Sequence, residues 1–197
     1  MISLCVKGDD GVWFGVACDA RKVFATGFGF SKASVLKSLL EGVPFDSPFQ
    51  YSEKVSTFAG HVLDLVKNVY YGKDVVVDAS LAVEHLSVYA QNVIRAVSLV
   101  PVGYVTSYGV VAKAVGGSPR AVGRVMAMNP FAPLVPCHRV VCSDFTLGGY
   151  GGGLNVKLQL LKREKRGYIS KSEISLNGKK LLLFPVENVL NKVKEEN

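Results

Sequence analysis

The residues with the clearest chemical potential stand side by side in the run Pro136-Cys137-His138-Arg139. A cysteine is a useful nucleophile only as its thiolate, and a neighbouring imidazole or cation lowers the pKa of a thiol. His138 and Arg139 follow Cys137 directly. Because adjacent residues of an extended strand point to opposite faces, a tight turn or a bridging water is needed to join the thiol to the imidazole. The run predicts a cysteine nucleophile with a histidine base.

A histidine base needs a third group that sets its tautomer. Among the downstream acids, Glu164 is the best placed, on a helix expected over residues 157–166. Spacing alone leaves another interpretation open, in which Cys137 and Cys142 are buried core thiols and His138 is a hydrogen-bonded core residue. A metal site built from Cys137, His138 and Cys142 is disfavoured, because no second Cys or His cluster lies nearby to complete a tetrahedral set.

The composition is that of a folded chain. It has 197 residues, 49% hydrophobic and 20% charged, which suffices for one large domain or two small ones. Four cysteines are too few for a disulfide scaffold, and the scattered Cys5, Cys18, His61 and His85 match no compact zinc motif. The formal net charge of +7 favours an anionic partner, with nucleic acid first because its phosphates attract clustered Lys and Arg.

The sequence shows neither a membrane-spanning segment nor a secretory signal. No apolar run approaches the roughly 20 residues that span a bilayer. Residues 1–10 lack the basic segment, the long apolar segment and the cleavage site of a secretory signal. We therefore expect a cytoplasmic protein without a membrane partner.

The first part of the chain predicts a domain with a hairpin-linked antiparallel sheet. Alternating apolar and polar residues predict strands over residues 2–6, 12–18 and 22–30, with one more strand over 74–78. Apolar residues at helical spacing predict two helices joined by a Pro-containing loop, over residues 31–40 and 54–71. Beyond these elements the pattern becomes helical and glycines cluster. We expect domains over residues 1–85 and 86–197.

The second part predicts a helix-turn-helix. A helix over residues 86–99 precedes a second over residues 108–115, the tight turn Gly116-Gly117, and a third that Ser118 caps and Pro119 begins, running to about residue 128. The third helix carries small residues that would let its backbone approach a partner closely, and Arg120 and Arg124 share one face. An ordinary packed helical hairpin fits the same pattern.

A glycine-rich segment follows the candidate nucleophile. Residues 147–154 place Tyr150 among five glycines, and a tyrosine can stack on a base that has left its helix. A flexible linker is the alternative, although linkers seldom hold a tyrosine between such glycines and run directly into an apolar helix. The Lys- and Glu-rich stretch from Glu187 predicts a short amphipathic helix or a frayed tail.

Together, these segments closely resemble the O6-alkylguanine-DNA alkyltransferases, also called methylguanine-DNA methyltransferases, from about residue 102 to residue 167. The shared runs are Gly103-Tyr104-Val105-Thr106-Ser107-Tyr108, Ser118-Pro119-Arg120-Ala121-Val122-Gly123, Asn129-Pro130, Pro136-Cys137-His138-Arg139-Val140-Val141, and Gly149-Tyr150-Gly151-Gly152-Gly153-Leu154 followed by Lys157. The amino-terminal part carries no such motif, although its order of elements is similar to the family's RNase H-like domain. The resemblance implies an α+β fold: an RNase H-like domain with an antiparallel sheet, then a mainly helical winged-helix/helix-turn-helix domain.

The resemblance also implies a role for each site residue. Cys137 would accept the alkyl group, His138 would be its water-mediated base, and Glu164 would orient that histidine. Arg120 would replace the extruded nucleotide in the base stack. Tyr108 would crowd the phosphate that must rotate and donate a hydrogen bond to the flipped purine.

Further groups would hold the base. The carbonyls of Cys137 and Val140 would accept from the guanine amino group, and the amide of Gly151 would meet O6. Tyr150 would line the pocket, and Asn129 would tie the recognition helix to the active-site turn. Two departures stand out: Gly151 replaces a serine of many relatives, and Ala132 replaces a proline of some, which bears on bulky adducts.

The implied activity is a single irreversible transfer of an alkyl group from O6 of guanine, and also from O4 of thymine, in double-stranded DNA to Cys137. No cofactor or metal is needed, and we expect a monomer. One competing hypothesis is a non-catalytic winged-helix protein that binds lesions, but such family members lack the acceptor cysteine. The other is a cysteine hydrolase using Cys137 and His138, which leaves Tyr108 and Arg120 without a role.

Overall fold

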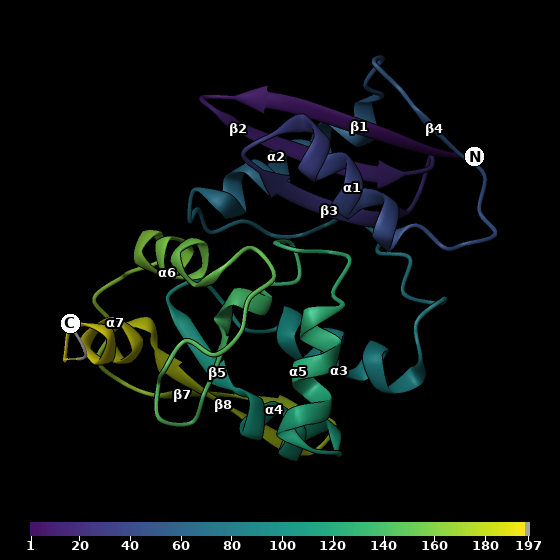
Figure 1. Ribbon diagram of the computed structural model, residues 1–197. Helices are drawn as coiled ribbons and strands as arrows, with labels where there is room; N and C mark the ends of the chain where they lie inside the picture. The colour runs from purple at the N-terminus through teal and green to yellow at the C-terminus, as the bar shows by residue number, and fades with distance from the viewer. Residues whose placement is uncertain (196–197) are drawn as a thin grey trace. The chain divides into compact units, whose positions relative to one another are not determined.

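The computed structural model describes residues 1–195, which form two compact units (Figure 1). Unit 1 comprises Met1–Tyr70, Val75–Leu86 and Asn129–Leu134, and unit 2 comprises Tyr71–Asp74, Ser87–Met128 and the chain from Val135 onward. The main change of unit falls between residues 86 and 87, next to the boundary expected after residue 85. Residues 71–74 belong to unit 2 and residues 129–134 belong to unit 1, although each segment lies on the other side of that boundary in the chain. A single expected boundary does not anticipate such exchanges.

Unit 1 is built on a four-stranded sheet of order β3-β2-β1-β4. Its strands are β1 (Ile2–Asp9), β2 (Val12–Cys18), β3 (Val23–Gly29) and β4 (Phe49–Tyr51). The first three are antiparallel, and the tight turn of the first hairpin places both Asp10 and Gly11 at positive φ, 47° and 76°. β4 pairs parallel with β1. The sheet is thus mixed: the expected antiparallel strands are joined by a parallel strand in a segment expected to be a loop, because three residues are too few to show alternation.

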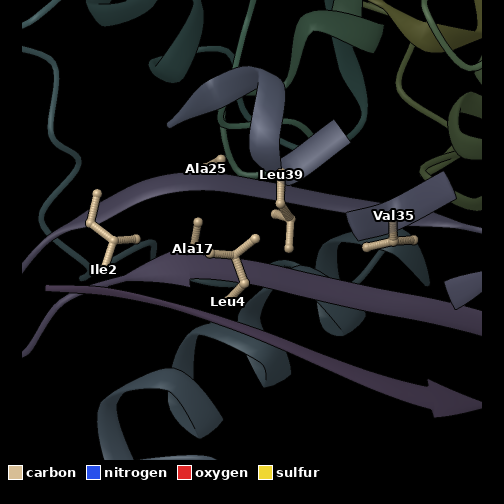
Figure 2. Close-up of a cluster of buried hydrophobic side chains, with 6 residues drawn as sticks. All are labelled: Ile2, Leu4, Ala17, Ala25, Val35 and Leu39. Carbon is tan, nitrogen blue, oxygen red and sulfur yellow. The ribbon is translucent and has the colours of Figure 1, made fainter. Parts of the chain in front are cut away.

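Two helices cover opposite faces of this sheet. α1 (Lys32–Gly42) begins after Ser31, whose side chain accepts from the Ser34 amide, and α2 (Thr57–Tyr70) follows β4. The α1 face buries a cluster that Figure 2 shows, made of Ile2, Leu4, Ala17, Ala25, Val35 and Leu39. On the other face the Tyr70 ring of α2 lies 5.4 Å from the ring of Phe14. Gly15 lets α1 approach, since a Cβ there would lie 2.4 Å from Val35.

The strand expected over residues 74–78 does not form. Val76 is 83% exposed, and the chain pairs with β3 only further on, where Val23 donates to Ser80 and Ala82 donates to Val23. The apolar residues 75–77 led to the prediction of a strand, but the segment pairs with no other strand and is largely exposed to solvent.

In its described residues, unit 2 combines five α-helices and the short 3-10 helix η1 with a second sheet of order β6-β5-β8-β7. Its elements in chain order are α3 (Val88–Ser98), β5 (Tyr104–Ser107), α4 (Tyr108–Val115), α5 (Pro119–Ala127), η1 (Cys137–Arg139), β6 (Val140–Val141), α6 (Leu154–Arg163), β7 (Ser172–Leu176), β8 (Lys179–Pro185) and α7 (Val186–Glu195). The predicted α+β class is confirmed. α6 ends earlier than expected, so that Glu164 is its C-cap residue.

The carboxyl-terminal elements complete the core of unit 2. The β7–β8 hairpin, which was not among the expected elements, pairs with β5 through Tyr104 opposite Pro185 and Val105 opposite Phe184. α7 buries Val186, Val189 and Leu190 against Val105, Val141 and Leu161. The stretch from Glu187 is therefore a packed helix as far as residue 195. Across residues 1–195, no helix has both the length and the apolarity required to cross a membrane.

Candidate active site

The candidate nucleophile lies on a compact turn of unit 2. Pro136 has φ −79° and ψ 65°, and the amide of Cys137 donates across it to the Val135 carbonyl at 2.8 Å. The Arg139 amide donates to Pro136, and the Val140 amide to Cys137, which closes the 3-10 turn η1. A proline suits the start because its ring holds φ and it has no N–H to satisfy. The tight turn that adjacent Cys and His side chains require is thus present.

The turn is anchored and buried. Directly after it, β6 pairs parallel with β5, with Thr106 opposite Val140 and Ser107 opposite Val141. Cys137 is 7% exposed and His138 is fully buried. The thiol is therefore almost enclosed, and backbone hydrogen bonds hold the turn on both sides of it.

Glu164 joins the two residues that follow the cysteine. His138 Nε2 lies 2.8 Å from Glu164 Oε1, and Arg139 donates from Nε to Oε2 and from Nη2 to Oε1, both at 2.9 Å. The remaining Arg139 nitrogen, Nη1, donates to the Val100 carbonyl at 2.5 Å. Both oxygens of a carboxylate that is 1% exposed are therefore satisfied. This arrangement places the predicted orienting residue against the predicted base.

The electrostatics of this cluster set the histidine tautomer. Burial by itself would raise the pKa of Glu164, but His138 and Arg139 lower it to about 2, so the carboxylate is ionised at neutral pH. Burial lowers the pKa of His138, which is therefore neutral there, although Glu164 opposes this shift. An ionised carboxylate can only accept, so the His138 proton is on Nε2. Nδ1 is left as an acceptor, and it has no hydrogen-bond partner among residues 1–195.

Acid should destabilise the protein through this cluster. As the pH falls, the unfolded chain takes up protons on His138 below its usual pKa of 6.5 and on Glu164 below 4.5, while the folded chain resists both. The stability that His138 and Glu164 contribute is therefore fully present above about pH 6.5 and is lost as the pH falls toward 2. Of this contribution, roughly 3 kcal/mol comes from Glu164. Urea unfolding at a series of pH values measures this loss. A free energy of unfolding that stays constant from about pH 6 to pH 3 would contradict it.

Lys157 is a site residue to which the sequence analysis assigned no role. Its side chain is fully buried, and Nζ donates to the carbonyls of Val140 and Leu147, both at 2.6 Å, and of Gly149 at 3.3 Å. Burial lowers its pKa to about 8. These bonds join α6 to the strand after the cysteine and to the glycine-rich segment. The available signal was a lysine on the otherwise apolar face of α6.

Tyr108 stands between the helix-turn-helix and the glycine-rich segment. It begins α4, which Ser107 caps by accepting from the Val110 amide, and its hydroxyl donates to the Gly149 carbonyl at 3.4 Å. Burial, with smaller contributions from Cys142 and Cys137, raises the pKa of Tyr108 to about 12, so that the phenol remains a donor. Gly148 has φ 67°, and a Cβ there would lie 3.0 Å from the Tyr108 ring. The segment approaches the ring closely because this position is glycine.

The other residues of the glycine-rich segment lie beside the same turn. Burial, together with the nearby Cys137 and Glu164, raises the pKa of Tyr150 well above its usual range. Gly151 is exposed, and Gly153 begins α6 with φ 91°. The segment is thus a shaped loop that leads directly into α6, one face of which is buried, unlike a flexible linker.

The second helix of the helix-turn-helix presents its basic residues outward. In α5, Ser118 accepts from the Ala121 amide and Pro119 takes the first turn, as the sequence predicted. Val122 and Met126 are buried, whereas Arg120 and Arg124 are exposed. A Cβ on Gly123 would lie 3.9 Å from the Tyr108 ring, so this helix packs beside that tyrosine.

Two predicted residues lie in unit 1. Asn129 Oδ1 accepts from the Phe131 amide at 3.0 Å, and the Ala132 carbonyl accepts from Thr26 Oγ1 at 2.9 Å. The expected link from Asn129 to the active-site turn of unit 2 stays a prediction. Within residues 1–195, no three His, Cys, Asp or Glu side chains come together in a way that would hold a metal ion, and none of the cysteines forms a disulfide.

Comparison with protein families places this site in a known context. The family model described as 6-O-methylguanine DNA methyltransferase, DNA binding domain, matches residues 88–166. A methylated-DNA–protein-cysteine methyltransferase of Pyrobaculum aerophilum is 57% identical over 65 residues, which are 33% of this chain and 44% of that protein. The chain spans about half the length of the curated relatives that it matches.

Solved structures extend the likeness to both units. The O6-methylguanine-DNA methyltransferase of Pyrococcus kodakaraensis is 30% identical, with a TM-score of 0.61 over 83% of this chain and 99% of that one. Mycobacterium tuberculosis OGT, solved in complex with DNA, is 25% identical, with a TM-score of 0.65 over 83% of this chain and 92% of that one. The residues that the family model matches include the turn, the helix-turn-helix, α6 and its C-cap residue Glu164.

Proposed function

Because the chain belongs to the O6-methylguanine DNA methyltransferase family, we propose that it repairs O6-alkylguanine in double-stranded DNA by moving the alkyl group onto Cys137. The observation that carries this proposal is that Cys137 and His138 share a buried turn, that Glu164 at the end of α6 contacts His138 Nε2, and that His138 Nδ1 has no partner among residues 1–195. A hydrolase would need an oxyanion hole as well, and the exposed basic face of α5 would have no use in it.

The transfer is a single displacement. His138 Nδ1 takes the Cys137 proton through a water molecule, and Glu164 stabilises the imidazolium that forms. The thiolate sulfur then bonds to the alkyl carbon as the bond from that carbon to O6 breaks, and the electron pair goes to the guanine. The charge that develops on the base is stabilised by the Gly151 amide at O6 and by the Tyr108 hydroxyl, which turns from the Gly149 carbonyl to donate to the base. The product is a thioether, so each molecule acts once.

The base is held by backbone groups next to the nucleophile. The carbonyls of Cys137 and Val140 accept from the guanine amino group, and Tyr150 lines the pocket. Lys157 keeps Val140 and the glycine-rich segment together, since its Nζ contacts carbonyls of both. Gly151 offers only its backbone donor. We include O4-alkylthymine as a second substrate, and we propose a cytoplasmic monomer that uses no cofactor.

The direct test is the intact mass of the protein after incubation with a duplex carrying one O6-methylguanine, followed by peptide mapping. We expect a gain of one methyl group on the Cys137 peptide, stoichiometric and without turnover. Binding of the duplex by a protein whose mass does not change would instead favour a lesion-binding protein without transfer.

Arg120 provides a test of base extrusion. Replacing Arg120 by Ala should slow transfer from a duplex by roughly 10- to 100-fold, because the unstacking energy of a few kcal/mol is no longer compensated. Transfer from the free O6-methylguanine base should fall much less, because nothing has to be extruded. Single-turnover rates with both substrates measure the difference. Equal losses with duplex and free base would show that Arg120 does not act on extrusion.

A further inference from the structure

A second polar site of unit 2 lies at the tip of the β7–β8 hairpin. A cavity of about 180 Å³ is lined there by Asn92 and Arg95 of α3, by Val115 at the end of α4, and by Asn177 and Lys179 of the hairpin. The four polar side chains are exposed. Arginine, lysine and the amide nitrogen of asparagine are all hydrogen-bond donors, and two of these groups carry a full positive charge. The lining is suited to an anion.

The two cations of this site are available for a ligand. Among residues 1–195, neither Arg95 nor Lys179 forms an ion pair, whereas the neighbouring Lys180 pairs with Glu173 at 2.8 Å. Successive residues of a strand point to opposite faces, so Lys179 and Lys180 lie on different sides of β8. Only one of the two adjacent lysines therefore contributes to the cavity.

The backbone around the cavity is held in place. Asn177 and Gly178 form the hairpin turn, with φ of 50° and 76°, in the conformation that favours an Asn-Gly pair. Leu176 is 8% exposed and fastens the turn to the unit. Next to Val115 at the end of α4, the Gly116 carbonyl accepts a hydrogen bond from the Tyr89 hydroxyl of α3 at 3.2 Å. A prearranged site loses little conformational freedom when it binds a ligand.

The location of the cavity connects it to the helix-turn-helix. Val115 ends α4, Gly116 and Gly117 make the turn, and Ser118 caps α5. In Figure 1 the hairpin reaches α4 at the end of unit 2 where α5 begins. Val115, which lines the cavity, therefore precedes Arg120, the residue assigned to the base stack, by five positions in the chain.

We propose that Arg95 and Lys179, assisted by Asn92 and Asn177, bind a backbone phosphate of the DNA duplex beside the segment that α5 contacts. The identity of the anion rests on the proposed function, since DNA is the polyanion that the helix-turn-helix would bring to this face. A phosphate contact fixes the register of the protein on DNA without reading its sequence. The hairpin thus adds a second contact to the one made by α5.

The test compares three single variants, Arg95→Gln, Lys179→Gln and Lys180→Gln, in the chain of 197 residues. Each removes one positive charge, and the last is the matched control because Lys180 lies on the other side of β8. The affinity for an unmodified duplex is measured from about 50 to about 200 mM salt. For the first two variants, the slope of log K against the logarithm of the salt concentration should be shallower than that of the parent protein by about 0.9. Across this range of salt, the affinity of each variant should therefore fall by a factor about threefold smaller than the affinity of the parent protein falls.

The Lys180→Gln control distinguishes a local phosphate contact at the cavity from a general effect of the protein's positive charge on DNA binding. Lys180→Gln should keep the slope of the parent protein, and the losses for the other two should be the same on duplexes with and without O6-methylguanine. Equal slopes for Lys179→Gln and Lys180→Gln, or an unchanged slope for Arg95→Gln, would overturn the proposal. The assay involves no transfer step, so it gives its answer even if Cys137 gains no methyl group.

Discussion

Replacing Cys137 by Ser should reduce methyl transfer to below detection while duplex binding is retained. A hydroxyl is far less acidic than a thiol, so His138 cannot generate an alkoxide in useful amounts, and oxygen is a poorer nucleophile toward an alkyl carbon. The substituted side chain is nearly isosteric. Because position 137 is only 7% exposed, the buried hydroxyl should cost no more than about 1–3 kcal/mol of stability.

The measurement is intact mass after incubation with the methylated duplex, alongside the affinity for the same duplex. Cys142→Ser is the matched control, since it makes the same chemical change five positions along the chain at a partly exposed site and should leave transfer in place. A methyl group found on the Cys137→Ser protein would show that another residue is the acceptor.

Replacing Glu164 by Gln should have the second largest effect, on both stability and transfer. It leaves the buried Arg139 guanidinium without its carboxylate, which costs about 3–5 kcal/mol. The new amide can donate to His138 Nε2, which would move the histidine proton to Nδ1. The base would then carry its proton on the wrong nitrogen, and the transfer rate should fall by about 10⁴-fold, as expected for loss of the correct tautomer.

Stability and chemistry can be separated in this variant. Urea unfolding gives the free energy, and the single-turnover rate is taken at a temperature where the variant remains folded. Glu173→Gln makes the same change in the exposed pair with Lys180 and should cost less than about 1 kcal/mol. A Glu164→Gln protein that transfers methyl at the parental rate would show that Glu164 supports only the fold.

The helices of the second half were the most predictable part of the fold. α4 has the expected bounds, and the cap and proline of α5 stand where local rules require them. Such signals act within a few residues, so they can be recognised without knowledge of the tertiary structure. The hairpin of β7 and β8 also carried a local signal, the Asn177-Gly178 pair between segments that contain apolar residues, which was not used in the sequence analysis. Its pairing with β5, some 80 positions earlier in the chain, carried no local signal.

The sequence by itself determined the residue types and their order: a cysteine beside a histidine, a capped basic helix before them, and a glycine-rich segment with a tyrosine after them. Tertiary structure decided which of these groups meet. It brought Glu164 to both His138 and Arg139, buried Lys157 against three carbonyls, and placed Lys179 and Arg95 on one cavity. Burial and contacts between distant residues set the charge and tautomer of each group, and neither is encoded in local spacing.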